Sequence, residues 1–315
     1  MRRIPMSSLQ APKAVIMIRP WRFHPNPETA GDNAFQRETP HPDMAVASQA
    51  RAEFDRMVET LQSHGGKVHV FDDYGEHETP DSVFPNNWFS THPGGHIAIY
   101  PMYSPSRRRE RRSDVMNMLK SEYRVQDIID LSGLEWDELF LEGTGAMVLD
   151  HFERVAYTAN SLRANPIVLE RFCSHFHFEP MAFDAFDRQG NPVYHTNVLM
   201  TIGTDFALVG SRMIADEARR KEVIQRLEGT GRVVIDLDFS QIEGFAGNAL
   251  ELTGKEGRIL VLSQKAFDVL TPDQIKIIEP LARIVPLEVP TIELAGGSVR
   301  CMLAGIHLTR RGANL

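Results

Sequence analysis

Cysteine is scarce in this chain. Only Cys173 and Cys301 occur among 315 residues, so a disulfide framework is not expected. Long apolar runs are also missing, since none approaches the roughly 20 residues that cross a membrane. The basic N-terminal residues are not followed by the apolar segment of a secretory signal. We therefore expect a cytoplasmic protein with reduced thiols and no membrane partner.

Positive charge is the minority charge. Lys and Arg number 34 against 42 Asp and Glu, which gives a net charge of −8 and argues against nucleic acid as the main partner. Hydrophobic residues make up 42% and charged residues 24%, as in an ordinary soluble globular protein. Length alone favours roughly two domains of ~150 residues, but a repeat in the sequence favours one.

One order of elements returns along the chain, namely a hairpin, a helix and a connecting strand. Ahead of the first hairpin, apolar residues from Val46 to Leu61 recur at helical spacing. The glycine pair Gly65-Gly66 then stops this helix, and residues 67–71 alternate as a strand. The predicted helices cover residues 43–61, 107–112, 162–173, 213–227 and 266–281, and the last strand covers residues 298–308.

The entrances of the first strands share a near-constant period of 53 to 55 residues, at Asn87, Glu142, His195, Asn248 and Cys301. Such a period is typical of a modular or propeller-like array. The fifth repeat lacks its later elements, which the N-terminal segment can supply, as closure of a ring requires. We therefore predict an α/β fold, a five-bladed α/β propeller of pseudo-fivefold modules closed by the two ends of the chain. Residues 13–315 would form this single catalytic domain after a disordered tail over residues 1–12.

Three of these five positions carry reactive groups. Cys301 follows Gly296-Gly297, and a cysteine thiolate is a nucleophile. His195 can protonate a leaving amine and then activate water, and Glu142 can accept hydrogen bonds from a planar nitrogenous substrate. A lone buried cysteine is usually only a small hydrophobic residue. Independent structural residues, however, have no reason to share one register, which favours the catalytic interpretation.

Other motifs carry less chemistry. Cys173, His175 and His177 could ligate a metal, but a site needs three or four converging ligands, and we expect no metal. The arginine run over residues 107–112 alternates with acidic residues and is typical of a solvated helix face. Gly143-Thr144-Gly145 lacks the lysine of a phosphate loop, and no cofactor is expected.

The chain resembles the guanidino-group-modifying superfamily (penteins), which includes arginine deiminases, dimethylargininases, amidinotransferases and succinylarginine dihydrolases. The resemblance covers residues 13–308. It rests on Phe84-Pro85-Asn86-Asn87, Glu142-Gly143-Thr144-Gly145, His195-Thr196-Asn197 and the segment from Gly296 to Met302. It implies a propeller fold in which Cys301 is the nucleophile, His195 the acid and base, and Glu142 the acidic partner.

Two positions depart from the arginine-processing members. Asn87 and Asn197 stand where those members mostly have Asp. A guanidinium has only donors and suits carboxylates, whereas a neutral ureido group also has a carbonyl acceptor that Asn can satisfy. The FPNNW and EGTG segments are similar to those of citrulline-utilisation hydrolases. The resemblance therefore implies conversion of citrulline to ornithine, ammonia and CO₂ through a thiocarbamate on cysteine.

The expected ligand is a small ureido or guanidino amino acid. Further candidates for binding it are the amides Asn86 and Asn248 and, for its α-carboxylate, Arg19, Arg212 and Arg300. The Pro- and Asn-rich segment 21–42, with Asn33, Phe35 and Gln36, is a candidate lid. A homodimer is possible. Two alternatives stay open: an arginine-type deiminase or amidinotransferase, and a non-catalytic pentein binding module.

Overall fold

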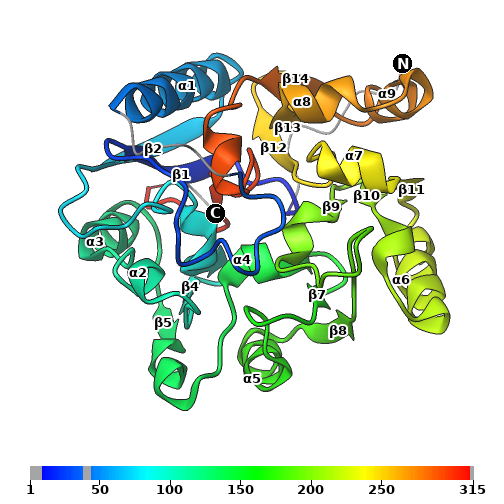
Figure 1. Cartoon of the computed structure of the whole chain (residues 1–315), viewed down its shortest axis with the longest axis horizontal. Coiled ribbons are helices and arrows are strands. Elements are labelled where there is room, and N and C mark those ends of the chain that lie inside the picture. The colour runs from blue at the N-terminus through cyan, green and yellow to red at the C-terminus, as the bar shows by residue number, and fades with distance from the viewer. Residues whose placement is uncertain (1–8, 38–43, 313–315) are drawn as a thin grey trace.

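The computed structural model describes residues 9–37 and 44–312. In this part of the chain, fifteen strands form five three-stranded sheets. Figure 1 shows the sheets gathered around a common centre, with the longer helices on the outside. Four of the sheets follow one another along the chain: β3 (Phe89–His92), β4 (His96–Ile99) and β5 (Asp127–Asp130); β6 (Met147–Asp150), β7 (Val155–Ala159) and β8 (Glu179–Phe183); β9 (Met200–Ile202), β10 (Phe206–Val209) and β11 (Val233–Asp236); β12 (Leu250–Gly254), β13 (Gly257–Ser263) and β14 (Arg283–Leu287).

All four sheets are built in the same way. The first two strands form an antiparallel hairpin, and the third strand pairs in parallel with the second. A parallel pair needs a long crossover connection, and here a helix supplies it. The predicted order of hairpin, helix and connecting strand is therefore confirmed in each of these repeats.

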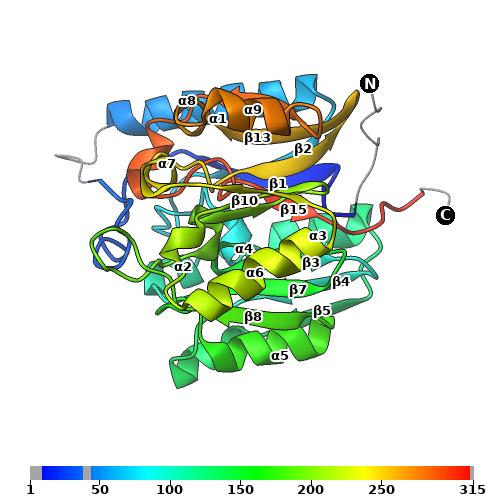
Figure 2. The ribbon, with the colours of Figure 1, turned by 90° about the vertical axis from the view of Figure 1, so that its right-hand side faces the viewer.

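The fifth sheet joins the two ends of the chain. β1 (Ala14–Pro20) lies between β15 (Ala304–Ile306), with which it is antiparallel, and β2 (Lys67–Asp73), with which it is parallel. Ala14 pairs with Ile306, and β1 and β15 lie side by side in Figure 2. The N-terminal segment thus supplies the strands and helix that the last repeat lacks, as the sequence predicted.

The outer helices are fixed by local capping. α5 (Pro166–Phe176) begins with proline after Asn165, whose side chain accepts a hydrogen bond from the backbone N–H of Ile167. Thr271 and Gln274 form a capping box at the start of α9 (Pro272–Ile278). The remaining longer helices are α1 (Met44–Ser63), α3 (Ser113–Glu122) and α6 (Glu217–Gly229). No helix within residues 9–37 and 44–312 is long and apolar enough to cross a membrane.

Several predicted boundaries were wrong. The arginine run does not lie in one helix: α2 (Pro105–Arg108) ends within it, and α3 starts only at Ser113. The helix predicted over residues 266–281 is divided into α8 (Gln264–Asp268) and α9, because Pro272 cannot continue a helix. The helix predicted from residue 213 begins at residue 217, after the capping Asp216.

The predicted N-terminal tail also needs correction. Its first eight residues lie outside the described part of the chain, but residues 9–12 are held in place. Gln10 is buried, and its amide donates to the carbonyl oxygens of Leu149 and Ile202. The backbone oxygen of Pro12 accepts from the N–H of Thr253. These bonds tie the segment to three different sheets or their connections, so it is part of the fold.

Candidate active site

The five periodic residues lie in equivalent places. Each lies two to five residues before the first strand of its sheet, and none is more than 3% exposed. Asn87, His195 and Cys301 line one small cavity. The predicted strand over residues 298–308 was wrong in part, because only residues 304–306 are extended. Cys301 instead lies in a turn, in which its backbone N–H donates to Ser298.

Glu142 and His195 form a buried pair. Nε2 of His195 lies 2.9 Å from Oε2 of Glu142, and the other carboxylate oxygen accepts from the backbone N–H of Tyr103 at 3.0 Å. With Nε2 engaged by the carboxylate, Nδ1 is the ring nitrogen left to exchange a proton with another group. The carboxylate therefore fixes the orientation of the imidazole.

Two arginines that sequence reasoning missed lie on either side of this pair. Arg107 and Arg163 are both buried, and their Nη1 atoms lie 3.7 Å and 3.6 Å from Oε2 of Glu142. Burial alone would raise the pKa of Glu142, but Arg163, His195 and Arg107 together hold it well below its usual value. The carboxylate is therefore ionised across the neutral pH range.

The same surroundings act on His195 in the opposite direction. Burial lowers its pKa, and the positive charges of Arg163 and Arg107 lower it further. The hydrogen bond and charge of Glu142 raise it, without cancelling the other effects. The pKa of His195 therefore lies below its ordinary value, and the imidazole is mainly neutral at pH 7.

The thiol of Cys301 is surrounded by amides. Nδ2 of Asn197 lies 3.4 Å from its sulfur, and Nδ2 of Asn248 lies 3.3 Å from it. Oδ1 of Asn248 accepts from the backbone N–H of Arg300, and its Nδ2 also donates to the backbone oxygen of Asn197. Asn248 therefore links the turn of Cys301 to the segment of Asn197, and both amides can stabilise a thiolate.

Asn87 presents a hydrogen-bond donor to the cavity. Its Oδ1 accepts from Arg107 at 2.7 Å, which leaves Nδ2 buried without a partner in the part of the chain that the structure describes. Space for this arrangement comes from Gly145, where a Cβ atom would lie 2.2 Å from Nδ2 of Asn87 and 2.8 Å from Nδ1 of His195. Any larger residue at position 145 would displace both side chains.

Asp81, which no sequence pattern singled out, also lines the cavity. Its Oδ2 accepts from Asn26, whereas its Oδ1 has no partner among the described residues. Burial raises its pKa, and Arg107 and Asn26 offset only part of this. A buried acceptor without a partner is costly, so this atom is suited to an N–H group of a ligand.

The three arginines predicted to hold a carboxylate do not line this cavity. Arg19 pairs with Asp55 and Asp72 beside β2, and Arg212 is exposed. Arg300 lies behind Cys301, where its guanidinium donates to the carbonyl oxygen of Leu303. The cations that do line the cavity are Arg107 and Arg163.

Asn86, another predicted ligand residue, is fully buried but is not part of the cavity wall. Its backbone oxygen accepts from the hydroxyl of Thr144 at 3.3 Å. It therefore joins the loop before β3 to the one before β6, and its neighbour Asn87 is the residue that faces the cavity.

The described part of the candidate lid, residues 21–37, covers the cavity. Thr29 and Asn33 are part of its wall, and Asp32 forms an ion pair with Arg163 through two hydrogen bonds, at 2.5 Å and 2.7 Å. Asn33 contacts the glycine turn through the carbonyl oxygen of Ala295. The segment thus closes over the cavity by binding one of the two cations in its wall.

The prediction that the arginine run forms a solvated helix face was wrong for Arg107. Arg107 is buried and pairs with Glu110 through two hydrogen bonds.

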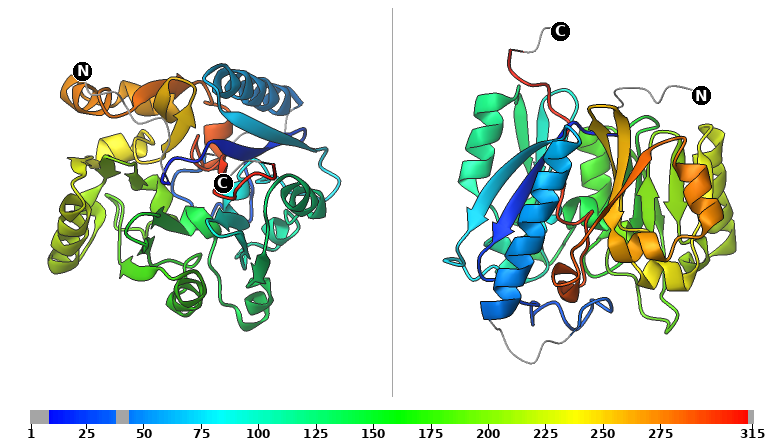
Figure 3. Two further views of the ribbon diagram at one scale, coloured as in Figure 1. Left: turned by 180° about the vertical axis from the view of Figure 1, so that it is seen from behind. Right: turned by 90° about the horizontal axis from the view of Figure 1, so that it is seen from above.

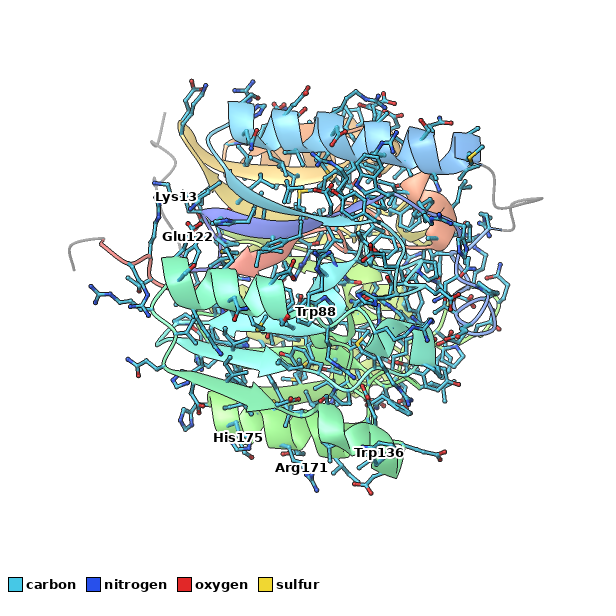
Figure 4. The ribbon with its side chains drawn as sticks, turned by 90° about the vertical axis from the view of Figure 1, so that its left-hand side faces the viewer. Lys13, Trp88, Glu122, Trp136, Arg171 and His175 are labelled. Atoms are coloured by element: carbon cyan, nitrogen blue, oxygen red, sulfur yellow. The ribbon has the colours of Figure 1, made fainter. Side chains whose placement is uncertain are left out.

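The residues that could bind a metal do not converge. Cys173 is buried in α5, whereas His175 is exposed and points away from the sheets in Figure 4. Within the described residues, no three His, Cys, Asp or Glu side chains are placed to hold a metal ion.

Comparison with known proteins gives a family match over most of the chain. The model of the family described as eukaryotic N,N-dimethylarginine dimethylhydrolase matches residues 19–308. Among curated proteins, none matches the chain.

Several solved structures are similar. The N-terminal domain of ArgZ with bound substrate, an arginine dihydrolase from cyanobacteria, has a TM-score of 0.72 and 14% identity, over 93% of this chain and 97% of that one. AgrE in complex with ornithine and NAD⁺ has a TM-score of 0.70 and 15% sequence identity, and the match covers 96% of this chain and 40% of that one. A dimethylarginine dimethylaminohydrolase carrying an S-methyl-L-thiocitrulline adduct has a TM-score of 0.60 and 13% sequence identity. That match covers 95% of this chain and 99% of the other. The arrangement of several small sheets with outer helices is thus the fold of these enzymes.

Proposed function

Because the chain belongs to the N,N-dimethylarginine dimethylhydrolase family, within the superfamily that its motifs predicted, we propose that it is a cysteine hydrolase that cleaves a C–N bond of a ureido amino acid. Our best candidate for the substrate is citrulline, with ornithine, ammonia and CO₂ as products. The catalytic domain would be a five-bladed propeller, a proposal that the five similar sheets support. The observation that carries the proposal is the convergence of Cys301, the His195–Glu142 pair and the free amide of Asn87 on one buried cavity.

The first half of the reaction would release ammonia. The Cys301 thiolate attacks the ureido carbon, and the negative charge that develops on oxygen is met by Nδ2 of Asn87. When the thiolate forms, Nδ1 of His195, the nitrogen not bound to Glu142, takes the thiol proton of Cys301, and the resulting imidazolium then delivers this proton to the departing amino group. The product is a thiocarbamate on Cys301 that still carries the rest of the substrate.

The second half would release the amine. Neutral His195 takes a proton from water, and the resulting hydroxide attacks the thiocarbamate carbon. The C–S bond breaks, which regenerates the Cys301 thiolate, and the free N-carbamate loses CO₂ to leave ornithine. Ionised Glu142 stabilises the imidazolium that forms in each half-reaction.

The preference for a neutral ureido group follows from Asn87. Since Arg107 occupies its Oδ1, the atom that it offers to a ligand is an N–H donor. A carbonyl oxygen can accept this hydrogen bond, whereas a guanidinium has no acceptor. Placing a guanidinium N–H opposite Nδ2 of Asn87 would leave two buried donors without an acceptor, which costs roughly 1–3 kcal/mol.

A guanidino substrate is the second candidate, and Asp81 favours it. The unpartnered Oδ1 of this buried carboxylate lines the same cavity and suits a cationic N–H group. The printed names of ArgZ and of the dimethylarginine dimethylaminohydrolase also refer to guanidino compounds. For a ureido substrate, we assign Asp81 to the α-ammonium group instead.

The α-carboxylate of the substrate would bind Arg163. This cation lines the cavity and stacks on the ring of Tyr194 at 5.0 Å. Asp32 of the candidate lid forms an ion pair with Arg163, so the substrate carboxylate would replace a carboxylate of the chain. Residues 21–37 would then act as the lid.

Turnover of purified protein tests the proposal. We expect citrulline to give ornithine, ammonia and CO₂ in equal amounts, and we expect Cys301→Ser to abolish this. Arginine, agmatine, methylarginines and succinylarginine are measured in parallel. Release of citrulline from arginine, with no consumption of citrulline, would replace the proposal by an arginine-type deiminase. No turnover of any compound would favour a binding module, and Cys173→Ser serves as the matched control.

A further inference from the structure

A second cavity lies behind the catalytic one, along the centre of the molecule. The first strands of all five sheets contribute to its wall. The red C-terminal segment that carries β15 runs near this centre in the views along the shortest axis (Figures 1 and 3). Cys301 precedes β15 at the catalytic end, and His307 follows it at the other end.

One guanidinium in this wall has no acidic partner. Arg300 lines the cavity, and its Nη1 donates to the carbonyl oxygen of Leu303 at 3.1 Å. No carboxylate lies in the described wall of the cavity, and within residues 9–37 and 44–312 no ion pair of Arg300 is formed. Burial lowers the pKa of Arg300 to about 10, which still leaves the group charged at neutral pH. Arg300 is partly buried, and a charge withdrawn from water without a counter-ion is costly.

Two histidines add hydrogen-bonding capacity to the same wall. His151 and His307 both line the cavity, and their rings lie 4.0 Å apart. His151 is 6% exposed, and its Nδ1 has no partner among the described residues. Burial lowers the pKa of both histidines, so each is neutral and carries one N–H. The ring of His307 already forms a hydrogen bond with the backbone of Leu9, so His151 is the histidine that adds a free nitrogen.

The carboxylate next to His151 in sequence does not neutralise Arg300. Asp150 is fully buried next to His151, but it forms an ion pair with Arg232 at 2.6 Å, closed by a second hydrogen bond at 3.0 Å. This pair is already balanced in charge. The cavity therefore contains one uncompensated positive charge and an imidazole nitrogen without a partner.

We propose that this central cavity binds a small monovalent anion between the guanidinium of Arg300 and the imidazole of His151. A halide or formate has the required charge and size, and it accepts hydrogen bonds from donors in any direction. The site is separate from the proposed catalytic cavity and does not depend on the activity assigned to it.

A bromide soak of crystals grown without halide tests the site directly. We expect an anomalous peak in the central cavity within about 3.5 Å of the Arg300 guanidinium, a normal contact distance for an anion. Bromide found only at surface positions, with none in this cavity, would overturn the proposal. The soak uses the unmodified protein and therefore does not depend on the folding of any variant.

Thermal unfolding gives the matching solution test. At equal ionic strength, bromide in place of gluconate should raise the Tm by about 2–4 °C, because a ligand that binds only the folded state stabilises it. Arg300→Met should lose this rise, and Arg171→Met, at an exposed arginine of α5 (Figure 4), should keep it. His151→Phe, which retains an aromatic ring, should reduce the rise if Arg300→Met does not fold. Equal rises in all variants would contradict the proposal.

Discussion

Nε2 of His195 donates a hydrogen bond to Oε2 of Glu142 at 2.9 Å, across a separation of 53 residues in sequence. Both side chains are buried, at 2% and 0% exposure. The pair positions Nδ1 of the imidazole for proton transfer, and Arg107 and Arg163 keep the carboxylate ionised. Three buried groups, His195, Arg107 and Arg163, thus keep the Glu142 carboxylate ionised.

Glu142→Gln tests this relationship. The amide keeps a hydrogen bond but removes the negative charge that raises the pKa of His195. We expect kcat to fall by about 10²–10⁴-fold, the range for a positioned acid–base group. The acidic limb of the kcat/KM profile should move to lower pH, because the imidazole then protonates less readily.

The unmodified enzyme provides the reference for that profile. Its acidic limb should lie below about 6.5, the ordinary histidine pKa, since burial lowers the pKa of His195. If the acidic limb of the kcat/KM profile moved to higher pH in Glu142→Gln, the carboxylate would not be stabilising the imidazolium.

Gly145→Ala should impair catalysis without unfolding the protein. The added Cβ would lie 2.2 Å from Nδ2 of Asn87 and 2.8 Å from Nδ1 of His195, so both side chains must move. A displacement of about 1 Å can cost 10²-fold in rate, and we expect a loss of that order in kcat/KM.

Gly133→Ala is the matched control, because a Cβ at that position meets nothing within 4 Å. Circular dichroism and the Tm would check that both variants are folded. Full activity in Gly145→Ala would mean that Asn87 or His195 is not needed in its observed position.

Asn87→Asp tests the choice of substrate. The carboxylate would still accept from Arg107 but would no longer offer an N–H donor to the cavity. We expect the ratio of kcat/KM for citrulline to that for arginine to fall by about 10–100-fold, which corresponds to the cost of one buried unpaired group. Because both substrates are measured on one preparation, folding defects cancel from the ratio. An unchanged ratio would remove Asn87 from the account of specificity.

Asp32→Asn tests the candidate lid. The change removes the charge that binds Arg163, and the contacts of residues 26–37 with the cavity should weaken. We expect amide hydrogen exchange in this segment to speed up by about tenfold or more, since losing one partner of a buried pair is strongly destabilising. Citrulline should slow the exchange again by supplying a carboxylate to Arg163.

Asp137→Asn, at an exposed aspartate, serves as the control for this measurement. Exchange in residues 26–37 that is the same in both variants would show that the Asp32–Arg163 pair does not hold the segment closed.

The reactive trio could be found from the sequence because it repeats. Glu142, His195 and Cys301 occupy equivalent positions before successive first strands, and a period is visible without coordinates. The pairing of β1 with β15 could be predicted in the same way, because the last repeat lacked elements that the first segment supplied.

The charged environment of the trio could not be predicted. Arg107 belongs to a run of arginines whose other members are partly exposed, and nothing local distinguishes the buried one. Arg163 reaches Asp32, 131 residues away, and Asp81 acquires its role only when the loop before β3 folds over the cavity. The turn at Cys301 was predicted as a strand because a short apolar run is equally compatible with a strand and with a buried turn.

Mass spectrometry of the acid-quenched enzyme during turnover of citrulline is the most direct test of the proposed mechanism. We predict an adduct on the peptide containing Cys301 with the mass of citrulline less ammonia, as a thiocarbamate that retains the amino-acid portion requires. The adduct should be absent from Cys301→Ser. An adduct on Cys173, one that has lost the amino-acid portion, or turnover without any adduct on Cys301 would contradict the mechanism.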